Sequence, residues 1–500
     1  MSQIREITKR ILKKTLKAAQ IAAIISLTAL ITVILVNAFD ARKLGHLKIW
    51  HDTKLKSEFK AQDYTEEMTF DDYLKTEETL FAELNEKVTQ KLRKSDNELF
   101  NRYYPDSFSN SSKFTRDYNR SYELVPDDVQ GGIVLLHGLT DSPYSLKDIG
   151  QIFYEKGFHV LSIRLPAHGT VPRALVDVKW KDWTAAVKLA CRDLHRKTGP
   201  GKPFYIAGYS NGGALSLHYA IDAMKDASLP LPDRLFLFSP AIGVTKFAAL
   251  SNCLQAVSFI PYFKNSRWRS ITPEYDPFKY NSFPLNASEQ TYKLTMKTKA
   301  AIGKLSKKAS VAHLPPIITF QSVVDSTVII NDLVYKLYGK LKGNEDELVL
   351  FDVNRTAYLS NFFKSTHDRL LDRLTRSDQL GYTLTIVGNA ETSEDVIVKS
   401  KDAGQLDFSR KTELKSKWPR PVYSLSHIAM VVPIDDPLYG LEPPYTGDGY
   451  KLQLGRIELR GERNLLRINA NDLLRLRSNP FFDYIEQRII EIISADIKSN

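Results

Sequence analysis

The stretch Gly208-Tyr209-Ser210-Asn211-Gly212 directly follows the apolar run Pro203-Phe204-Tyr205-Ile206-Ala207. The next residues, Gly213-Ala214-Leu215-Ser216-Leu217-His218-Tyr219-Ala220, have the composition of a helix. This order predicts a strand, a sharp turn and a helix, with Ser210 at the apex of the turn. Side chains two residues before and two residues after the serine would collide in so tight a turn, and both positions are glycine. The stretch therefore predicts a serine hydroxyl lifted above the end of a sheet.

From residue 131 onward, apolar runs alternate with helical patterns, which is typical of a parallel sheet covered by helices on both faces. Strands are expected at Gly132–Leu136, His159–Arg164, Pro203–Ala207, Arg234–Phe238, Pro316–Gln321 and Glu347–Asp352. The expected helices include Lys181–Lys197 and Gly212–Lys225. Two longer intervals, 241–312 and 353–420, interrupt the alternation and are expected as insertions. The second interval is rich in charge and has a regular pattern only at Tyr382–Val387.

Residues 18–39 carry no formal charge and are mostly apolar, and their length matches the roughly 20 residues that a helix needs to cross a bilayer. Six Lys/Arg precede this run, and three follow it closely. This bias predicts a cytoplasmic segment at 1–17, an uncleaved transmembrane helix at 18–39, and the rest of the chain on the periplasmic or extracellular side. In a Gram-negative cell the membrane would be the inner one. A cleaved signal peptide is the alternative, but Asn37-Ala38-Phe39-Asp40-Ala41 is a poor cleavage site.

The remaining chain divides into a membrane-proximal region at 40–128, expected to be mostly helical, and one large domain at 129–500. The formal charge is +11, but no Lys/Arg cluster with interleaved aromatic residues predicts nucleic-acid binding. Cys191 and Cys253 lack the spacing of a metal site and are expected to be buried free thiols rather than a disulfide. We predict no cofactor and no metal, and the sequence gives no indication of an oligomeric state.

A serine hydroxyl needs a base to take its proton and an acid to orient that base. In a strand–turn–helix setting the acid and then the histidine follow the serine along the chain. Asp325 ends the apolar run that begins at Pro316, and we expect it to be the acid. Asp325 is also placed to cap a following helix, and both roles are compatible. Asp352, at the end of the next expected strand, is the alternative acid.

Four histidines follow Ser210 in the sequence: His218, His313, His367 and His427. His218 lies two turns along the helix after the serine and is expected to face away from it, while His313 precedes the strand of the acid. His427 follows a short strand-like run and is expected in a loop, where a base should sit. His367 reads as the polar start of a helix. We therefore predict His427 as the base and keep His367 as the alternative.

An oxyanion formed during acyl transfer is stabilised by backbone N–H groups. We expect one N–H from Asn211, directly after the serine, and one from Leu139, in the loop after the first expected strand. Gly138 allows a close approach of that loop, and His137 is expected to brace it.

Three stretches together resemble α/β-hydrolases, and among them the monoacylglycerol lipase, lysophospholipase and carboxylesterase group. They are His137-Gly138-Leu139-Thr140-Asp141-Ser142-Pro143-Tyr144-Ser145, Leu165-Pro166-Ala167-His168-Gly169 and Gly208-Tyr209-Ser210-Asn211-Gly212-Gly213. The resemblance implies a serine hydrolase in which Ser210, Asp325 and His427 act together. This chain departs from such relatives at Asn211, where many have an apolar residue, and in the long interval between the acid and the histidine.

The interval 241–312 corresponds to the cap that covers the site in such enzymes. Its aromatic and apolar residues favour an acyl chain or another apolar group, or else they only pack the cap onto the sheet. These residues are Phe247, Leu254, Phe259, Ile260, Tyr262, Phe263, Trp268, Tyr275, Phe278, Tyr280 and Phe283.

The sequence thus predicts a membrane-anchored serine esterase or lipase acting on lipid-like or other apolar esters. A serine peptidase or an acyltransferase would use the same residues, because the same groups attack amides and can pass an acyl group to an alcohol. A catalytically silent binding protein of the same fold is the alternative of a different class.

Overall fold

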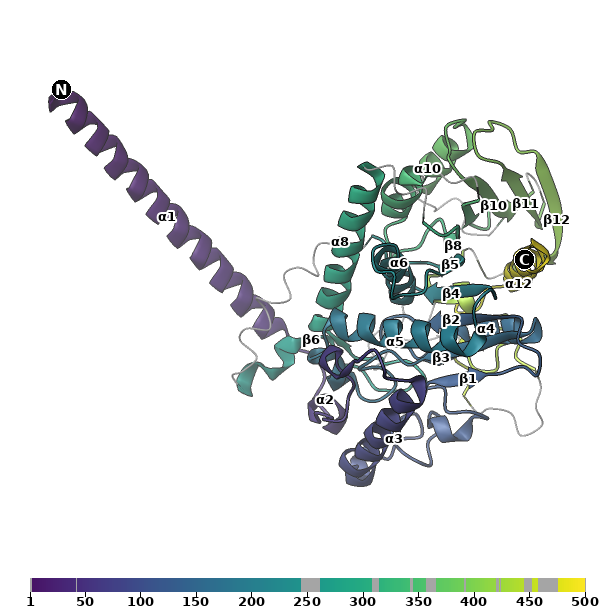
Figure 1. Cartoon of the computed structure of the whole chain (residues 1–500). Coiled ribbons are helices and arrows are strands. Elements are labelled where there is room, and N and C mark those ends of the chain that lie inside the picture. Colours follow the sequence, from purple (N-terminus) through teal and green to yellow (C-terminus); the bar gives the residue numbers. More distant parts are fainter. Residues whose placement is uncertain are drawn as a thin grey trace.

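The computed structural model describes most of the chain. The described residues are 2–41, 43–243, 261–307, 314–341, 345–356, 366–390, 393–419, 422, 424–444, 452–456 and 475–499. Their centre is a ten-stranded sheet with the order β1-β3-β2-β4-β5-β8-β9-β10-β11-β12 (Figure 1). Neighbouring strands from β3 to β10 run parallel, and antiparallel strands occupy both edges. The strands are β1 Tyr122–Leu124, β2 Gly131–Leu136, β3 Phe158–Ile163, β4 Phe204–Tyr209, β5 Arg234–Phe238, β8 Ile317–Ser322, β9 Glu347–Phe351, β10 Thr383–Asn389, β11 Asp395–Lys401 and β12 Arg410–Lys417.

Each of the six strands expected from the sequence is confirmed within about two residues. The central strands are buried along their whole length, because helices cover both faces of the sheet. Val134 and Leu136 belong to one apolar core with residues of α5 and α6, whereas Ile133 and Leu135 belong to a second core with residues of α4 and α12. Alternate residues of β2 therefore point to opposite faces of the sheet and pack against the two helical layers.

The helices of the domain lie between and after these strands. Their bounds are α4 Lys147–Glu155, α5 Trp180–Thr198, α6 Asn211–Ala223, α8 Leu285–Lys307, α9 Ile330–Asp332, α10 Thr366–Thr375 and α12 Phe482–Ser499. The final helix, α12, returns to α4 on one face of the sheet. The C-terminal part of the chain is thereby part of the core rather than an appendage.

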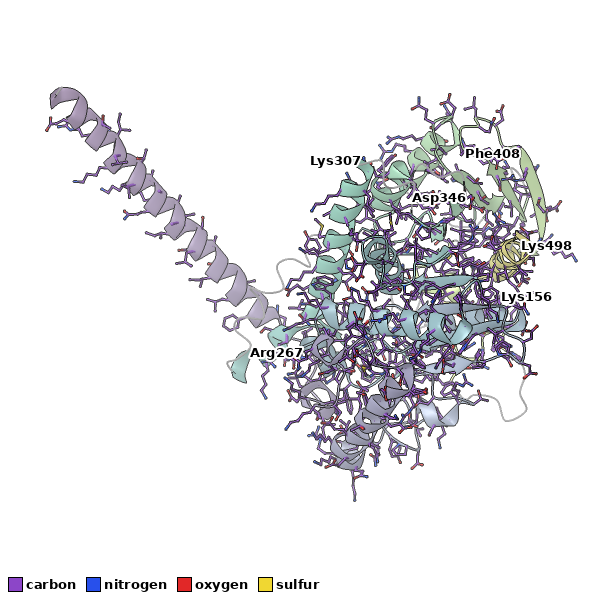
Figure 2. The ribbon with its side chains drawn as sticks, viewed as in Figure 1. Lys156, Arg267, Lys307, Asp346, Phe408 and Lys498 are labelled. Carbon is purple, nitrogen blue, oxygen red and sulfur yellow. The ribbon has the colours of Figure 1, made fainter. Side chains whose placement is uncertain are left out.

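The N-terminal helix α1, Ser2–Ala41, includes the run at 18–39 and extends away from the rest of the molecule (Figure 1). Its side chains stand out along its length, and several large apolar ones are exposed, among them Ile21, Ile24 and Ile25 (Figure 2). Within the part of the chain that the structure describes, no helix combines the length and the apolar character of a membrane crossing. The predicted transmembrane helix thus finds no support there.

The region at 40–128 is less helical than expected. It contains α2 Ile49–Asp52 and α3 Phe70–Lys87, together with 3₁₀ turns of three residues each. The apolar residues of α3 recur at helical spacing, and Phe70, Tyr73 and Leu80 are buried. After residue 92, short polar side chains bind nearby backbone groups and compete with helix formation, as Asn101 and Ser107 do.

The two expected insertions differ in character. The described part of 241–312 contains a 3₁₀ turn at Pro261–Arg267, whose last residue is labelled in Figure 2, the short strands β6 Trp268–Ser270 and β7 Phe283–Pro284, and α8. The interval 353–420, in contrast, supplies α10 and the strands β10, β11 and β12 of the main sheet. The periodic run at Tyr382–Val387 is β10, which pairs in parallel with β9. β12 forms the outer edge of the sheet, and most of its residues are exposed.

Candidate active site

Ser210 lies at the turn between β4 and α6, with φ +53° and ψ −112°. A residue other than glycine rarely adopts such a backbone conformation, and a strained serine at this turn is the mark of a nucleophile elbow. A β-carbon at position 208 would lie 2.3 Å from Ser216 Oγ, and one at position 212 would lie 1.8 Å from Leu136 O. Both glycines are therefore required by the turn, as the sequence predicted.

His427 and Asp325 form a direct hydrogen bond, with 2.7 Å between His427 Nδ1 and Asp325 Oδ2. The Asp325 carboxylate also accepts hydrogen bonds from Gln321 Nε2 and from the backbone N–H groups of Thr327 and Val328. Its side chain is completely buried. Burial alone would raise the pKa of Asp325, but His427 and these donors hold it below its ordinary value. Asp325 thus stays ionised beside the imidazole while it also caps the following turn.

Three further contacts hold the histidine loop in place. Ser322, the last residue of β8, donates a hydrogen bond from its hydroxyl to the carbonyl of Leu425, at 3.0 Å. The Ser426 hydroxyl donates to the carbonyl of Leu476. The ring of Tyr209 lies 5.2 Å from the ring of His427, measured between centroids. The loop is therefore fixed to the strand that carries the acid and packed against the residue before Ser210.

The loop after β2 brings Leu139 to the region of Ser210 and His427. His137 braces this loop, because its Nε2 accepts the N–H of Leu165 and its Nδ1 lies 2.9 Å from Gly138 O. Burial lowers the pKa of His137 well below its ordinary value, so the ring stays neutral. Asn211 is the first residue of α6, where a backbone N–H has no acceptor within the helix. The two residues expected to supply oxyanion donors thus lie in the loop after β2 and at the start of α6.

A cavity of about 580 Å³ joins these groups, since Leu139, Ser210, Asn211 and His427 all line it. Asp325 lies behind His427. Among the aromatic residues expected in the cap, Tyr275, Tyr280 and Phe283 line the cavity. Phe278 instead stacks on Tyr144, with ring centroids 4.4 Å apart. Trp268 packs against His51. The side chains expected at 247, 254, 259, 260, 262 and 263 lie outside the described residues.

The alternative residues have other surroundings. Asp352 directly follows β9 and pairs with Arg355, with Oδ2 2.8 Å from Nε. His218 lies on α6 beside Thr298, away from the cavity. The backbone of His367 lies in α10, but its side chain, like all of His313, is outside the described residues. Cys191 is a buried free thiol, and Cys253 is also outside those residues.

The sequence did not predict the basic side chains that line the cavity: Arg269, Lys279, Arg475 and Arg477. Nor did it predict Asp141 and Asp276 as lining carboxylates. Asp141 follows the His137-Gly138 pair closely, so its place near the serine was open to inference. Arg475 and Arg477 had no such signal, because they lie far beyond His427 in the chain.

Residues 127–318 match the family model described as "Serine aminopeptidase, S33". A thermostable monoacylglycerol lipase of Bacillus sp. (strain H-257) is 26% identical over 176 residues, which are 35% of this chain and 65% of that enzyme. The match thus spans less than two thirds of the length of this curated relative.

Among solved structures, one from a study of the metagenome-derived lipolytic enzymes LipS and LipT has a TM-score of 0.38 and 18% identity, over 52% of this chain and 98% of that chain. A monoacylglycerol lipase of Paleococcus ferrophilus has a TM-score of 0.35 and 14% identity, over 51% of this chain and 97% of that one. The parallel sheet, the serine elbow and the family match over residues 127–318 together define the α/β-hydrolase fold.

Proposed function

We propose that this protein is a serine hydrolase that cleaves carboxylic esters through an acyl-enzyme. The observation that carries the proposal is the hydrogen bond between His427 and the buried carboxylate of Asp325, in a loop packed beside the strained Ser210. A purely structural role for the turn at Ser210 would not require a histidine–aspartate pair nearby. A purely structural ion pair would not require a strained serine at the same cavity.

In the proposed reaction, His427 takes the proton of the Ser210 hydroxyl while the serine oxygen attacks the ester carbonyl. Asp325 holds the imidazole in the required tautomer and stabilises the imidazolium. The backbone N–H groups of Leu139 and Asn211 donate to the oxyanion. The imidazolium then gives its proton to the leaving alcohol, and water repeats the sequence to release the acid.

A fluorophosphonate probe and a panel of p-nitrophenyl esters of increasing chain length test this proposal. The full chain should be labelled at Ser210 and should hydrolyse the esters. His427→Ala should be as damaging as Ser210→Ala, and the double variant hardly worse, because the groups act as a unit. Absence of labelling at Ser210 would favour the silent binding protein.

The acid is tested by a matched pair of variants. Asp325→Asn should lower the hydrolysis rate by orders of magnitude, because the imidazole loses its orienting acceptor. Asp352→Asn should leave the rate near that of the unmodified protein, because Asp352 pairs with Arg355 instead. The reverse result would place the acid one strand later.

The same residues could serve an amide substrate or an acyltransferase. The name of the matching family refers to an aminopeptidase, whereas the name of the curated relative refers to a lipase. Hydrolysis of aminoacyl p-nitroanilides, and product analysis of ester reactions with added alcohol, separate these reactions from simple ester hydrolysis. Our proposal predicts ester hydrolysis as the fastest of the three.

We also propose that residues 18–39 attach the hydrolase to a membrane with its large domain outside the cytoplasm. The support is the uncharged apolar run and the excess of Lys/Arg before it. Carbonate extraction of membranes from cells that express the full chain, followed by protease treatment of spheroplasts, tests both parts. Release by carbonate contradicts the attachment, and protection from protease contradicts the orientation.

A further inference from the structure

The cavity around Ser210 carries more basic than acidic side chains. Its basic side chains are those of Arg269, Lys279, Arg475 and Arg477, and its acidic ones are those of Asp141 and Asp276. An entirely apolar acyl or alcohol group gives no reason for so many cations in one site, because charged groups lose solvation when a substrate covers them. The basic lining therefore points to a charged part of the substrate.

The two carboxylates offset only part of the charge of these four cations. Asp276 Oδ1 accepts hydrogen bonds from the Tyr439 hydroxyl at 2.6 Å and from the Phe278 N–H at 3.0 Å. Burial raises the pKa of Asp141 to about 6, although Lys279 opposes this change. Above this pH Asp141 is ionised, but four basic side chains against two carboxylates still leave the cavity with a positive excess.

Arg477 is the most informative of the basic residues, because it is only 7% exposed and poorly paired. Its Nη1 lies 3.9 Å from Asp276 Oδ2, and its Nη2 lies 3.5 Å from the Tyr275 hydroxyl. Its Nε has no hydrogen-bond partner among the described residues. Both measured contacts are at the outer limit for direct interaction. A buried guanidinium in this condition is costly unless an anion completes its environment.

The segment that carries Arg475 and Arg477 also touches both loops of the proposed reaction centre. Arg475 Nη2 donates to the hydroxyl of Ser326, the residue after Asp325, at 3.2 Å. The carbonyl of Leu476 accepts from the hydroxyl of Ser426, the residue before His427. One substrate molecule could accordingly bind these arginines through one group and reach Ser210 with another.

A second buried donor lies next to the serine. The side-chain Nδ2 of Asn211 is buried and has no partner in the described part of the chain, while its Oδ1 accepts from the Thr291 hydroxyl. Asn211 and Thr291 both line the cavity. Apolar residues provide another part of the lining: Phe283, Val328, Ile428, Val431 and Val432. The site therefore offers surfaces for an apolar chain and donors for an acceptor-rich group.

We infer that the substrate is an amphiphilic ester whose acid or alcohol part carries an anionic group, a phosphate or a carboxylate, which binds Arg477 with help from Arg475, Lys279 and Arg269. This inference rests on the proposed function and narrows its substrate class. Guanidinium groups suit both anions, because their paired N–H donors match two oxygens at once. The anion selects the substrate and takes no part in the bond that breaks.

Two matched substrate pairs test the inference with the full chain. One pair is 1-oleoylglycerol 3-phosphate and 1-oleoylglycerol, which differ only in the phosphate. The other is mono-p-nitrophenyl glutarate and p-nitrophenyl pentanoate, which have the same chain length and differ in the terminal carboxylate. We expect kcat/KM to favour the anionic member at least tenfold in one pair, and that pair identifies the anion. Equal rates, or preference for the neutral member in both pairs, would overturn the inference.

Variants locate the effect. Arg477→Gln, and separately the double change Arg269→Gln with Lys279→Gln, should reduce the preference mainly by raising KM for the anionic ester. Arg410→Gln, an exposed change on β12, is the charge-matched control and should keep the preference. If Arg477→Gln fails to fold, the double variant of the less buried residues still decides. An unchanged preference in the folded variants would overturn the assignment. Loss of hydrolysis of every ester, with no labelling of Ser210, would instead count against the proposed function.

Discussion

Arg164 and Arg477 are both buried arginines, but their surroundings are opposite. Arg164 is fully buried, and it donates from Nε to Glu77 at 2.8 Å, from Nη2 to Glu58 at 3.0 Å and from Nη1 to the carbonyl of His168 at 3.0 Å. Arg477 has only long contacts and an Nε without a partner among the described residues. A buried arginine can therefore serve two different purposes: Arg164 connects parts of the fold, and Arg477 is available to a ligand.

The location of each arginine agrees with this distinction. Arg164 follows β3, and its carboxylate partners come from the region at 40–128, Glu77 on α3 and Glu58 before it. The Tyr73 hydroxyl on α3 also donates to the Arg164 carbonyl, at 2.7 Å. This cluster therefore joins the N-terminal region to the sheet. Arg477 instead faces the cavity of the proposed reaction.

The substitution of Ser210 should have the largest effect, and it should change activity but not stability. Ser210→Ala should lower ester hydrolysis by about 10⁴-fold or more, because the nucleophile is lost, while the unfolding midpoint in urea stays nearly the same. Hydrolysis of p-nitrophenyl butyrate and urea unfolding measure the two quantities. Ser228→Ala, an exposed serine in a loop, is the control. More than a tenth of the original rate in Ser210→Ala would refute the role of Ser210.

On the structural side, Arg164→Met should cost about 3–5 kcal/mol of unfolding free energy, because it leaves the carboxylates of Glu58 and Glu77 without their cation. Urea unfolding measures the loss. The matched control is Arg410→Met, which removes an exposed ion pair with Asp402 and should cost no more than about 1 kcal/mol. Equal costs for the two variants would erase the contrast between buried and exposed pairs.

Asp141 extends the comparison to a carboxylate. Burial raises its pKa from 3.8 to about 6, so between these values the folded protein keeps a proton that the unfolded chain loses. Stability should consequently fall as pH rises from about 4 to about 6, by up to about 3 kcal/mol from this group. Asp141→Asn should remove this part of the pH dependence. Unfolding free energies measured in urea at several pH values check it, and parallel curves for the two proteins would contradict the expectation.

The smallest expected effect is that of Arg477→Met on stability. Its removal should change the unfolding free energy by no more than about 1 kcal/mol, because little pairing is lost and the cost of burying the charge disappears. Urea unfolding in parallel with Arg164→Met measures the contrast. A loss as large as that of Arg164→Met would mean that Arg477 is a structural residue.

The sequence predicted the parts of the site that local patterns determine. The elbow at Ser210 requires glycine at two fixed positions, and a strand end carries Asp325, so both could be recognised without knowledge of distant contacts. The position of His427 in a loop after the acid predicts it as the base, and the structure brings it to Asp325. Their catalytic roles stay predictions until they are measured.

The character of the cavity depends on contacts that no local pattern records. Arg477 reaches the cavity through a segment held by Ser426, and the aromatic residue Phe278 turns instead toward Tyr144. The aromatic composition of the interval 241–312 favours an apolar cap, but composition does not show in which direction each side chain points. The charged interval 353–420 was misleading for a related reason, since edge strands of a sheet need not alternate in polarity.

The outer strand β12 has a consequence for how copies of this protein behave at high concentration. An open sheet edge presents unpaired N–H and C=O groups that another chain could extend, and such growth leads to aggregates. β12 has the sequence Arg410-Lys411-Thr412-Glu413-Leu414-Lys415-Ser416-Lys417 and is largely exposed. Two such edges brought together would place like charges side by side. Electrostatic repulsion therefore opposes growth of the ten-stranded sheet at this edge, and it comes from the same charges that obscured this strand in the sequence.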